Sequence, residues 1–107
     1  MSVYRVVLAE EAAEDLLQIE DFTIAPELAS ATPDLDVVRR LRDAVDHAFR
    51  LLQFSPYSCR KAARALNDKQ RELIIPFGAA GLIAAFEVRG EVVRIGAIRH
   101  QLEQDYH

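Results

Sequence analysis

The last third of the chain contains three apolar segments joined by short turns, and this feature constrains the fold more than any other. The segments span residues 71–77, 82–88 and 92–99, and they are rich in the β-branched and aromatic residues that favour strands. The turns between them, Gly-Ala-Ala-Gly at 78–81 and Arg-Gly at 89–90, are short enough to join antiparallel neighbours. The sequence therefore predicts an antiparallel meander of three strands.

Alternation along the last of these segments predicts which side chains face the core. Val93, Ile95 and Ala97 should share one face and Arg94 and Ile98 the other, because successive side chains of a strand point to opposite faces. The glycine at position 96 is a candidate for a bulge or for a close approach of the backbone.

The chain begins with a predicted strand and a predicted helix. Residues 2–8 are largely β-branched or aromatic and are expected to form the opening strand. From Ala9 the apolar positions recur at about 3.6-residue spacing between acidic residues, which indicates an amphipathic helix. The sequence marks the end of this helix poorly, somewhere between Phe22 and Pro26.

A second amphipathic helix is expected between Thr32 and Ser55. Thr32 can accept a hydrogen bond from an unpaired amide as the N-cap, and Pro33 in the first turn sacrifices no bond. Pro56 ends the helix, because the residue before a proline is pushed out of the α region. Residues 57–70 have less periodicity and fit a loop with a short helix or a short strand.

The predicted order of elements is β-α-α-β-β-β, which is typical of the α+β class. The simplest arrangement is an antiparallel sheet with a helical hairpin packed on one face. A chain of 107 residues supports one hydrophobic core, so residues 1–107 are expected to form a single domain.

Composition narrows the class of protein further. Half of the residues are hydrophobic and 28% are charged, as in globular proteins, and the longest apolar runs are far shorter than the roughly 20 residues of a membrane span. The N-terminal residues do not resemble a signal peptide, and Cys59 has no second cysteine with which to pair. We therefore expect a cytoplasmic location and no membrane partner.

Charge is distributed unevenly along the chain. The net charge is −4, but residues 1–54 carry 5 Lys/Arg against 11 Asp/Glu, whereas residues 55–107 carry 8 against 6. An acidic total weakens binding to nucleic acid without excluding it, because basic residues can still converge on one face. The acidic half is suited to a basic partner.

A family resemblance emerges from the strand sequences. An Arg-Glu-Leu strand beginning at Arg71 runs into a Phe-Gly turn, and Val-Val-Arg-Ile-Gly-Ala-Ile-Arg-His-Gln follows at 92–101, with Glu103 and Tyr106 downstream. This pattern resembles the C-terminal half of ParE-type toxins in the RelE/ParE superfamily. The motifs cover about the last third of the chain, and the order of elements agrees over nearly all of it.

The resemblance implies the toxin of a type II toxin–antitoxin system. ParE-type members inhibit DNA gyrase by binding, and a ParD-like antitoxin neutralises them in a hetero-oligomer. RelE-type members instead cleave messenger RNA on the ribosome without a metal. A third possibility is a degenerate member that binds antitoxin without being toxic. The apolar hairpin at 81–86 offers few polar atoms for catalysis, which favours gyrase inhibition over RNA cleavage.

Each of these alternatives assigns its own functional residues. A ribonuclease would need cations, a base and an acid, and these candidates are Lys61, Arg71, His100 and Tyr106. A gyrase inhibitor needs a contact surface without catalytic geometry, and the resemblance places it on Arg71, Arg94, Arg99, His100 and Tyr106.

Each of these residues also has a possible structural role that involves no partner or substrate. The arginines can simply pair with Glu72, Glu87 or Glu91 across the sheet, and Cys59 can be a small packed residue. The sequence has no metal-ligand spacing and no glycine-rich phosphate loop, so no metal and no cofactor are expected.

Overall fold

The computed structural model describes residues 3–62, 67–78 and 81–101. Five of its segments form one mixed sheet in the order β1-β5-β4-β3-β2. The strands are β1 (Arg5–Leu8), β2 (Arg60–Lys61), β3 (Gln70–Ile75), β4 (Leu82–Arg89) and β5 (Val92–His100). The predicted meander is present, because β3 pairs antiparallel with β4 and β4 pairs antiparallel with β5.

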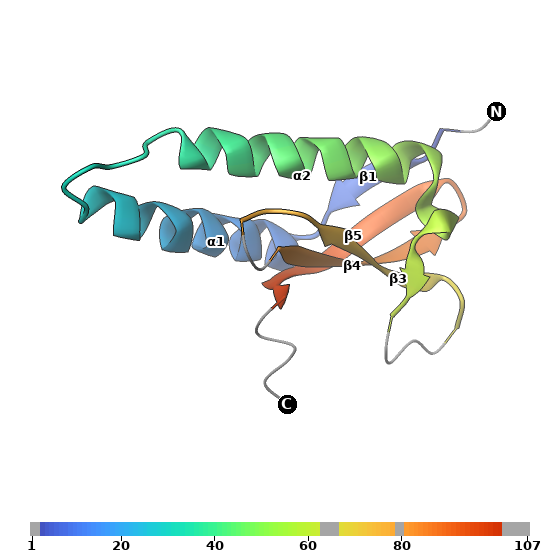
Figure 1. Cartoon of the computed structure of the whole chain (residues 1–107). Helices are drawn as coiled ribbons and strands as arrows, with labels where there is room; N and C mark the ends of the chain where they lie inside the picture. Colours follow the sequence, from blue (N-terminus) through green and yellow to red (C-terminus); the bar gives the residue numbers. More distant parts are fainter. Residues whose placement is uncertain (1–2, 63–66, 79–80, 102–107) are drawn as a thin grey trace.

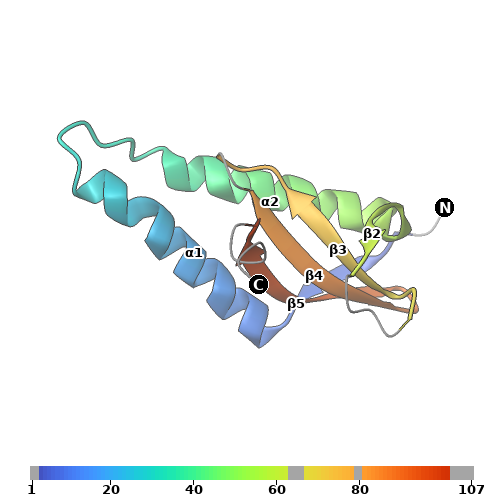
Figure 2. The same ribbon diagram turned by 60° about the horizontal axis from the view of Figure 1, so that its bottom comes forward.

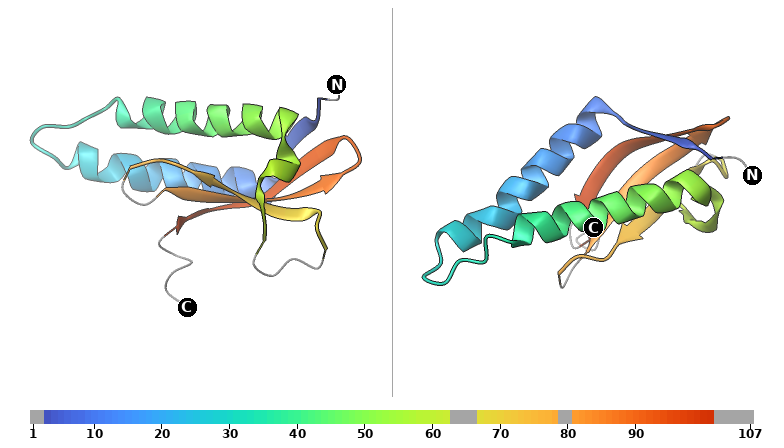
Figure 3. Two further views of the ribbon diagram at one scale, coloured as in Figure 1. Left: turned by 45° about the vertical axis from the view of Figure 1, so that its right-hand side comes forward. Right: turned by 90° about the horizontal axis from the view of Figure 1, so that it is seen from above.

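Two long helices cover one face of this sheet, as Figure 1 shows from the side. Helix α1 (Glu10–Leu28) and helix α2 (Val37–Phe54) run antiparallel as a hairpin, and the tip of the hairpin extends beyond the sheet. Seen from below and from above, the two helices diverge from this tip, with α1 along the β5 side of the sheet (Figures 2 and 3). The predicted α+β class and helical hairpin are confirmed.

The core lies between the helices and the sheet. Amphipathic spacing on α2 buries Leu41, Val45, Ala48 and Leu52, which lie three or four residues apart and therefore share one side of the helix. The sheet contributes side chains from alternate positions of its central strands: Leu82, Ala84, Phe86, Val88, Val93, Ile95 and Ile98. Burial of this apolar surface is the main force that holds the hairpin on the sheet.

The first strand differs from the prediction of an antiparallel sheet. β1 pairs parallel with β5, from Arg5 opposite Val92 to Leu8 opposite Ile95. The pairing is parallel because the whole helical hairpin and the meander separate the two strands, which gives the chain the long connection that parallel neighbours need. β1 ends at Leu8, and α1 takes its place beside the rest of β5.

A bulge in β5 corrects the predicted facing of its side chains. The register with β4 shifts at Gly96, so that Ala85 lies opposite Ala97 and Phe86 lies opposite Ile95. One extra residue reverses the alternation beyond that point. Ile98 is therefore buried in the core, whereas the sequence prediction had placed it on the opposite face from Val93 and Ile95.

The helix boundaries also differ from the sequence prediction. α1 continues through Pro26 to Leu28, and α2 begins at Val37 rather than after Thr32. The intervening loop has its own hydrogen bonds, since the Glu27 carboxylate accepts from Asp34 N at 2.8 Å. These local bonds compete with the helical first turn that the Thr32-Pro33 pair had suggested.

The segment between α2 and β3, for which the sequence predicted a loop with a short helix or a short strand, contains two short elements. A 3-10 turn, η1 (Pro56–Ser58), follows α2, and β2 then pairs Arg60 with Glu72 and Lys61 with Arg71. In the described part of the chain, none of the helices is long and apolar enough to cross a membrane.

Candidate partner-binding pocket

The structure divides the predicted functional residues between two ends of the sheet. Lys61 and Arg71 face each other in register on β2 and β3 at one end. His100 lies opposite Leu82, four rows of the sheet beyond the row in which Arg71 lies opposite Phe86, because the extra residue of the bulge at Gly96 adds no row. At about 3.4 Å per residue this is about 14 Å along the strands. Tyr106 lies outside the described residues.

Arg71 is held by main-chain oxygens. Its guanidinium donates to Cys59 O at 2.7 Å, to Tyr57 O at 3.3 Å and to Asp68 O at 2.7 Å. Its carbon Cζ also lies 4.9 Å from the centroid of the Tyr57 ring, within cation–π range. Arg71 therefore ties the segment after α2 to β3, and most of its donors are occupied by this task.

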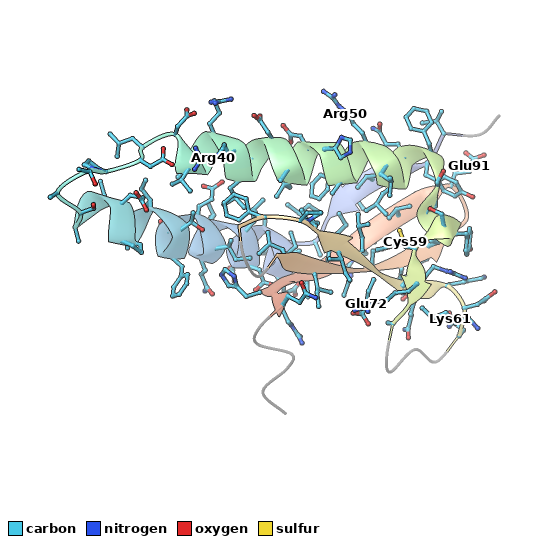
Figure 4. All side chains as sticks on the ribbon, in the orientation of Figure 1. Arg40, Arg50, Cys59, Lys61, Glu72 and Glu91 are labelled. Carbon is cyan, nitrogen blue, oxygen red and sulfur yellow. The ribbon has the colours of Figure 1, made fainter. Side chains whose placement is uncertain are left out.

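Cys59 lies at this junction, between the end of α2 and the sheet (Figure 4). The residue is buried, as expected for a packed side chain, and burial raises the pKa of its thiol despite the nearby Arg71. A thiol with a raised pKa is a poor nucleophile at neutral pH. Cys59 is thus part of the packing here.

Arg94 and Arg99 leave β5 on the face of the sheet away from the helices, and both are exposed. Arg94 lies opposite Glu87 in the register, but the Glu87 carboxylate accepts from Arg89 at 2.7 Å, which lowers the pKa of Glu87. Glu72 points to the same underside, as Figure 4 shows, and lies 3.4 Å from Arg60. Two of the acids that were expected to pair with these arginines, Glu72 and Glu87, thus contact Arg60 and Arg89, and the charge of Arg94 contributes to the lowered pKa of Glu87.

A pocket of about 300 Å³ opens between α1 and the end of β5. Four of its lining residues come from α1 and three from β5: Asp15, Gln18, Ile19, Phe22, Ile98, Arg99 and His100. Arg99 and His100, which the sequence analysis assigned to target binding, therefore both lie at this pocket. It combines apolar walls with a few polar groups, as binding pockets commonly do.

Asp15 joins α1 to the strand end. Its carboxylate accepts a hydrogen bond from Ile98 N at 3.0 Å. The Gln101 N to Gly81 O bond of 3.1 Å fixes the ladder so that the backbone of Ile98 and His100 points away from β4. Because β1 has already ended, Asp15 supplies the acceptor that a neighbouring strand would otherwise provide.

His100 lines the pocket and contains an unsatisfied nitrogen. Its Nε2 atom is buried and has no hydrogen-bond partner among the described residues. The ring meets Phe22 edge to face, with centroids 5.3 Å apart and an interplanar angle of 62°. Phe22 itself is 71% exposed, an unusual position for a large aromatic side chain. Unpaired buried polar atoms are costly, and they are common at functional sites.

Sequence reasoning found His100 and Arg99 but missed the helix side of the pocket. Asp15 was interpreted only as one of the acids beside the apolar stripe of a helix, Gln18 was not considered, and Phe22 served only as a marker of the helix end. The one available signal was Phe22, a large apolar residue off the predicted stripe. Among the described residues, no cluster of His, Cys, Asp and Glu could hold a metal ion.

Comparison with known proteins supports the expected fold. A solved structure described as "Chromosomal ParDE TA system from P. aeruginosa" contains a similar chain, with a TM-score of 0.64 and 17% sequence identity. The match covers 92% of this chain and 96% of that chain. No family model matches the sequence, and no curated protein matches it either. The chain therefore shares the fold of that chain over nearly its whole length, which agrees with the fold that the resemblance of its last third implied.

Proposed function

We propose that this chain is the toxin of a type II toxin–antitoxin system, that it inhibits DNA gyrase by binding, and that a ParD-like antitoxin neutralises it in the cytoplasm. The observation that carries this proposal is the shared fold over nearly the full length of both chains. The pocket at the end of β5 adds a local reason, since it gathers Arg99 and His100 where a partner can reach them.

Gyrase contact is assigned to the β5 end and the tail. Arg94 and Arg99 are exposed on β5, and Tyr106 follows them in the sequence. Arg71 contributes less in this proposal, because its guanidinium is engaged by three carbonyl oxygens. Exposed arginine and aromatic side chains are well suited to protein contacts that need no catalytic geometry.

A supercoiling assay with purified gyrase tests the target. We expect the chain to reduce supercoiling at a modest molar excess, and the double variant Arg94→Ala, Arg99→Ala to be weaker. Arg50→Ala, which removes an exposed arginine from the solvent side of α2 (Figure 4), is the matched control. Full gyrase activity at a large excess of folded protein would contradict gyrase inhibition.

Messenger RNA cleavage is the alternative outcome of inducing the chain in cells. It requires Lys61 and Arg71 to act with His100, yet Arg71 and His100 lie toward opposite ends of the sheet, about 14 Å apart along the strands. Loss of messages before any DNA damage response would favour cleavage. Unimpaired growth of cells that accumulate folded protein would indicate a degenerate member.

The antitoxin is expected to fold against this domain. Exposed apolar side chains on the hairpin, among them Leu17, Leu28 and Leu35, provide surface for it. An interface of roughly 1,500 Å² in total is expected for such a stable pair. Co-purification with the product of the adjacent gene, with a rise in melting temperature, is the test, and no rise in melting temperature would contradict the pairing.

A further inference from the structure

The pocket between α1 and β5 lies against a helix with an extreme charge. Between residues 10 and 28 the chain has seven carboxylates and no lysine or arginine. Glu20 contacts Arg42 at 3.2 Å, and the carboxylate of Glu27 accepts from the backbone of Asp34. The remaining acids apart from Asp15 are exposed: Glu10, Glu11, Glu14 and Asp21. The approach to the pocket along α1 is therefore electronegative.

The groups inside the pocket also suit a cation. The Asp15 carboxylate accepts one hydrogen bond, from Ile98 N, and a carboxylate can accept several more. The Nε2 atom of His100 accepts a hydrogen bond when the neutral ring carries its proton on Nδ1. This atom is buried in the free chain, so a ligand reaches it only when the neighbouring side chains move aside. The exposed ring of Phe22 can receive a cation on its face.

Arg99 is the only arginine or lysine among the described residues that line the pocket. Strand alternation separates it from the pocket interior, because Ile98 before it is buried in the core while the Arg99 side chain is exposed opposite Ile83 on the other face. Its charge therefore weakens the attraction for a cation at the rim without occupying the interior.

We propose that this pocket binds an arginine side chain of the antitoxin, through Asp15, the Nε2 atom of His100 and the ring of Phe22. A guanidinium is planar and has five donors in a fixed fork, so a single group can donate to a carboxylate and to a second acceptor at the same time. A volume of about 300 Å³ suits one long side chain. The identity of the partner rests on the proposed function, whereas the preference for a guanidinium rests on the pocket alone.

Nuclear magnetic resonance titration with blocked amino acids tests this assignment without any antitoxin. N-acetyl-arginine amide is expected to shift the Ile98 amide and the His100 ring signals in a saturable way below about 50 mM, the range of weak single-group binding. N-acetyl-glutamate amide is expected to leave both signals in place. No response to the arginine probe, or an equal response to both probes, overturns the assignment.

Two variants separate pocket binding from general attraction to an acidic surface. Asp15→Asn keeps an oxygen that can accept from Ile98 N but removes the charge, so it should weaken the arginine probe about tenfold. Asp21→Asn removes an exposed charge on the same helix and should change the affinity less than about twofold, because solvent screens it. Equal losses in the two variants overturn a specific site.

The same titration in the presence of the product of the adjacent gene identifies the occupant. If the antitoxin arginine fills the pocket, the free arginine probe no longer shifts the His100 ring in the complex. A probe that still binds in a stable complex overturns the antitoxin as the occupant. If no complex forms, the proposed antitoxin pairing fails, and the titration of the chain alone still decides whether the pocket selects a guanidinium.

Discussion

Arg71 and His100 were singled out for the same reason, as basic groups on the strands of the C-terminal half, but they occupy opposite physical situations. Arg71 donates to three main-chain carbonyl oxygens and lies over the Tyr57 ring. His100 has a buried nitrogen without a partner among the described residues, beside an exposed phenylalanine. A charged group whose donors have hydrogen-bond partners stabilises the fold. A buried polar atom without a partner lowers stability and retains the capacity to accept a hydrogen bond from a ligand.

Removal of the Arg71 side chain should have the largest effect on stability. Arg71→Ala is expected to lower the free energy of unfolding by about 2 kcal/mol, because three charge-assisted hydrogen bonds to carbonyl oxygens, one of them partly buried, are lost together. Arg71→Lys should restore only a part, since an ammonium cannot span three acceptors. Urea denaturation measures both, and an alanine variant as stable as the parent would remove the structural role of Arg71.

Removal of the Asp15 side chain should have the second largest effect on stability. Asp15→Ala leaves Ile98 N without its acceptor and is expected to cost about 1–2 kcal/mol of unfolding free energy. Asp15→Asn retains an acceptor, so its loss should be clearly smaller. Hydrogen exchange of the Ile98 amide provides a local check: the amide should exchange faster in the alanine variant, and unchanged protection would show that the bond is dispensable.

His100→Phe should raise stability slightly while it removes the pocket acceptor. The aromatic contact with Phe22 is kept and the unpaired nitrogen disappears, which is expected to raise the free energy of unfolding by about 1 kcal/mol. Thermal and urea denaturation can detect this gain. A loss of more than about 1 kcal/mol would mean that the imidazole nitrogen stabilises the folded chain after all.

Arg99 should have the smallest effect. It is exposed on the face of the sheet away from the helices, so Arg99→Gln is expected to change stability by less than about 0.5 kcal/mol. The same variant should tighten binding of the arginine probe modestly, because a positive charge at the rim is removed. Weaker binding in Arg99→Gln would show that this arginine helps to build the pocket.

Local patterns in the sequence were sufficient for the meander and the helical hairpin. Gly90 adopts a positive φ of 58° at the turn between β4 and β5, the conformation for which a glycine in a short turn is suited. The α2 stripe from Leu41 to Leu52 is buried as its spacing predicted. The residues whose pattern predicts each of these elements belong to the element itself or to the turn beside it.

The remaining features depend on contacts between distant residues. The parallel pairing of β1 with β5 joins segments about ninety residues apart, and the bulge at Gly96 reverses the facing of Ile98. The hydrogen bond from Ile98 to Asp15 spans 83 positions. Nothing in the α1 pattern distinguishes Asp15 from the other acids on the helix, so the pocket could be only half anticipated.

The most direct test measures antitoxin affinity for His100→Phe by isothermal titration calorimetry, with Arg50→Gln as an exposed control on α2. We expect at least a tenfold loss of affinity for His100→Phe at undiminished stability, and an unchanged affinity for the control. Parent-like affinity of folded His100→Phe would contradict the claim that the unsatisfied end of β5 is the partner-facing end of the molecule.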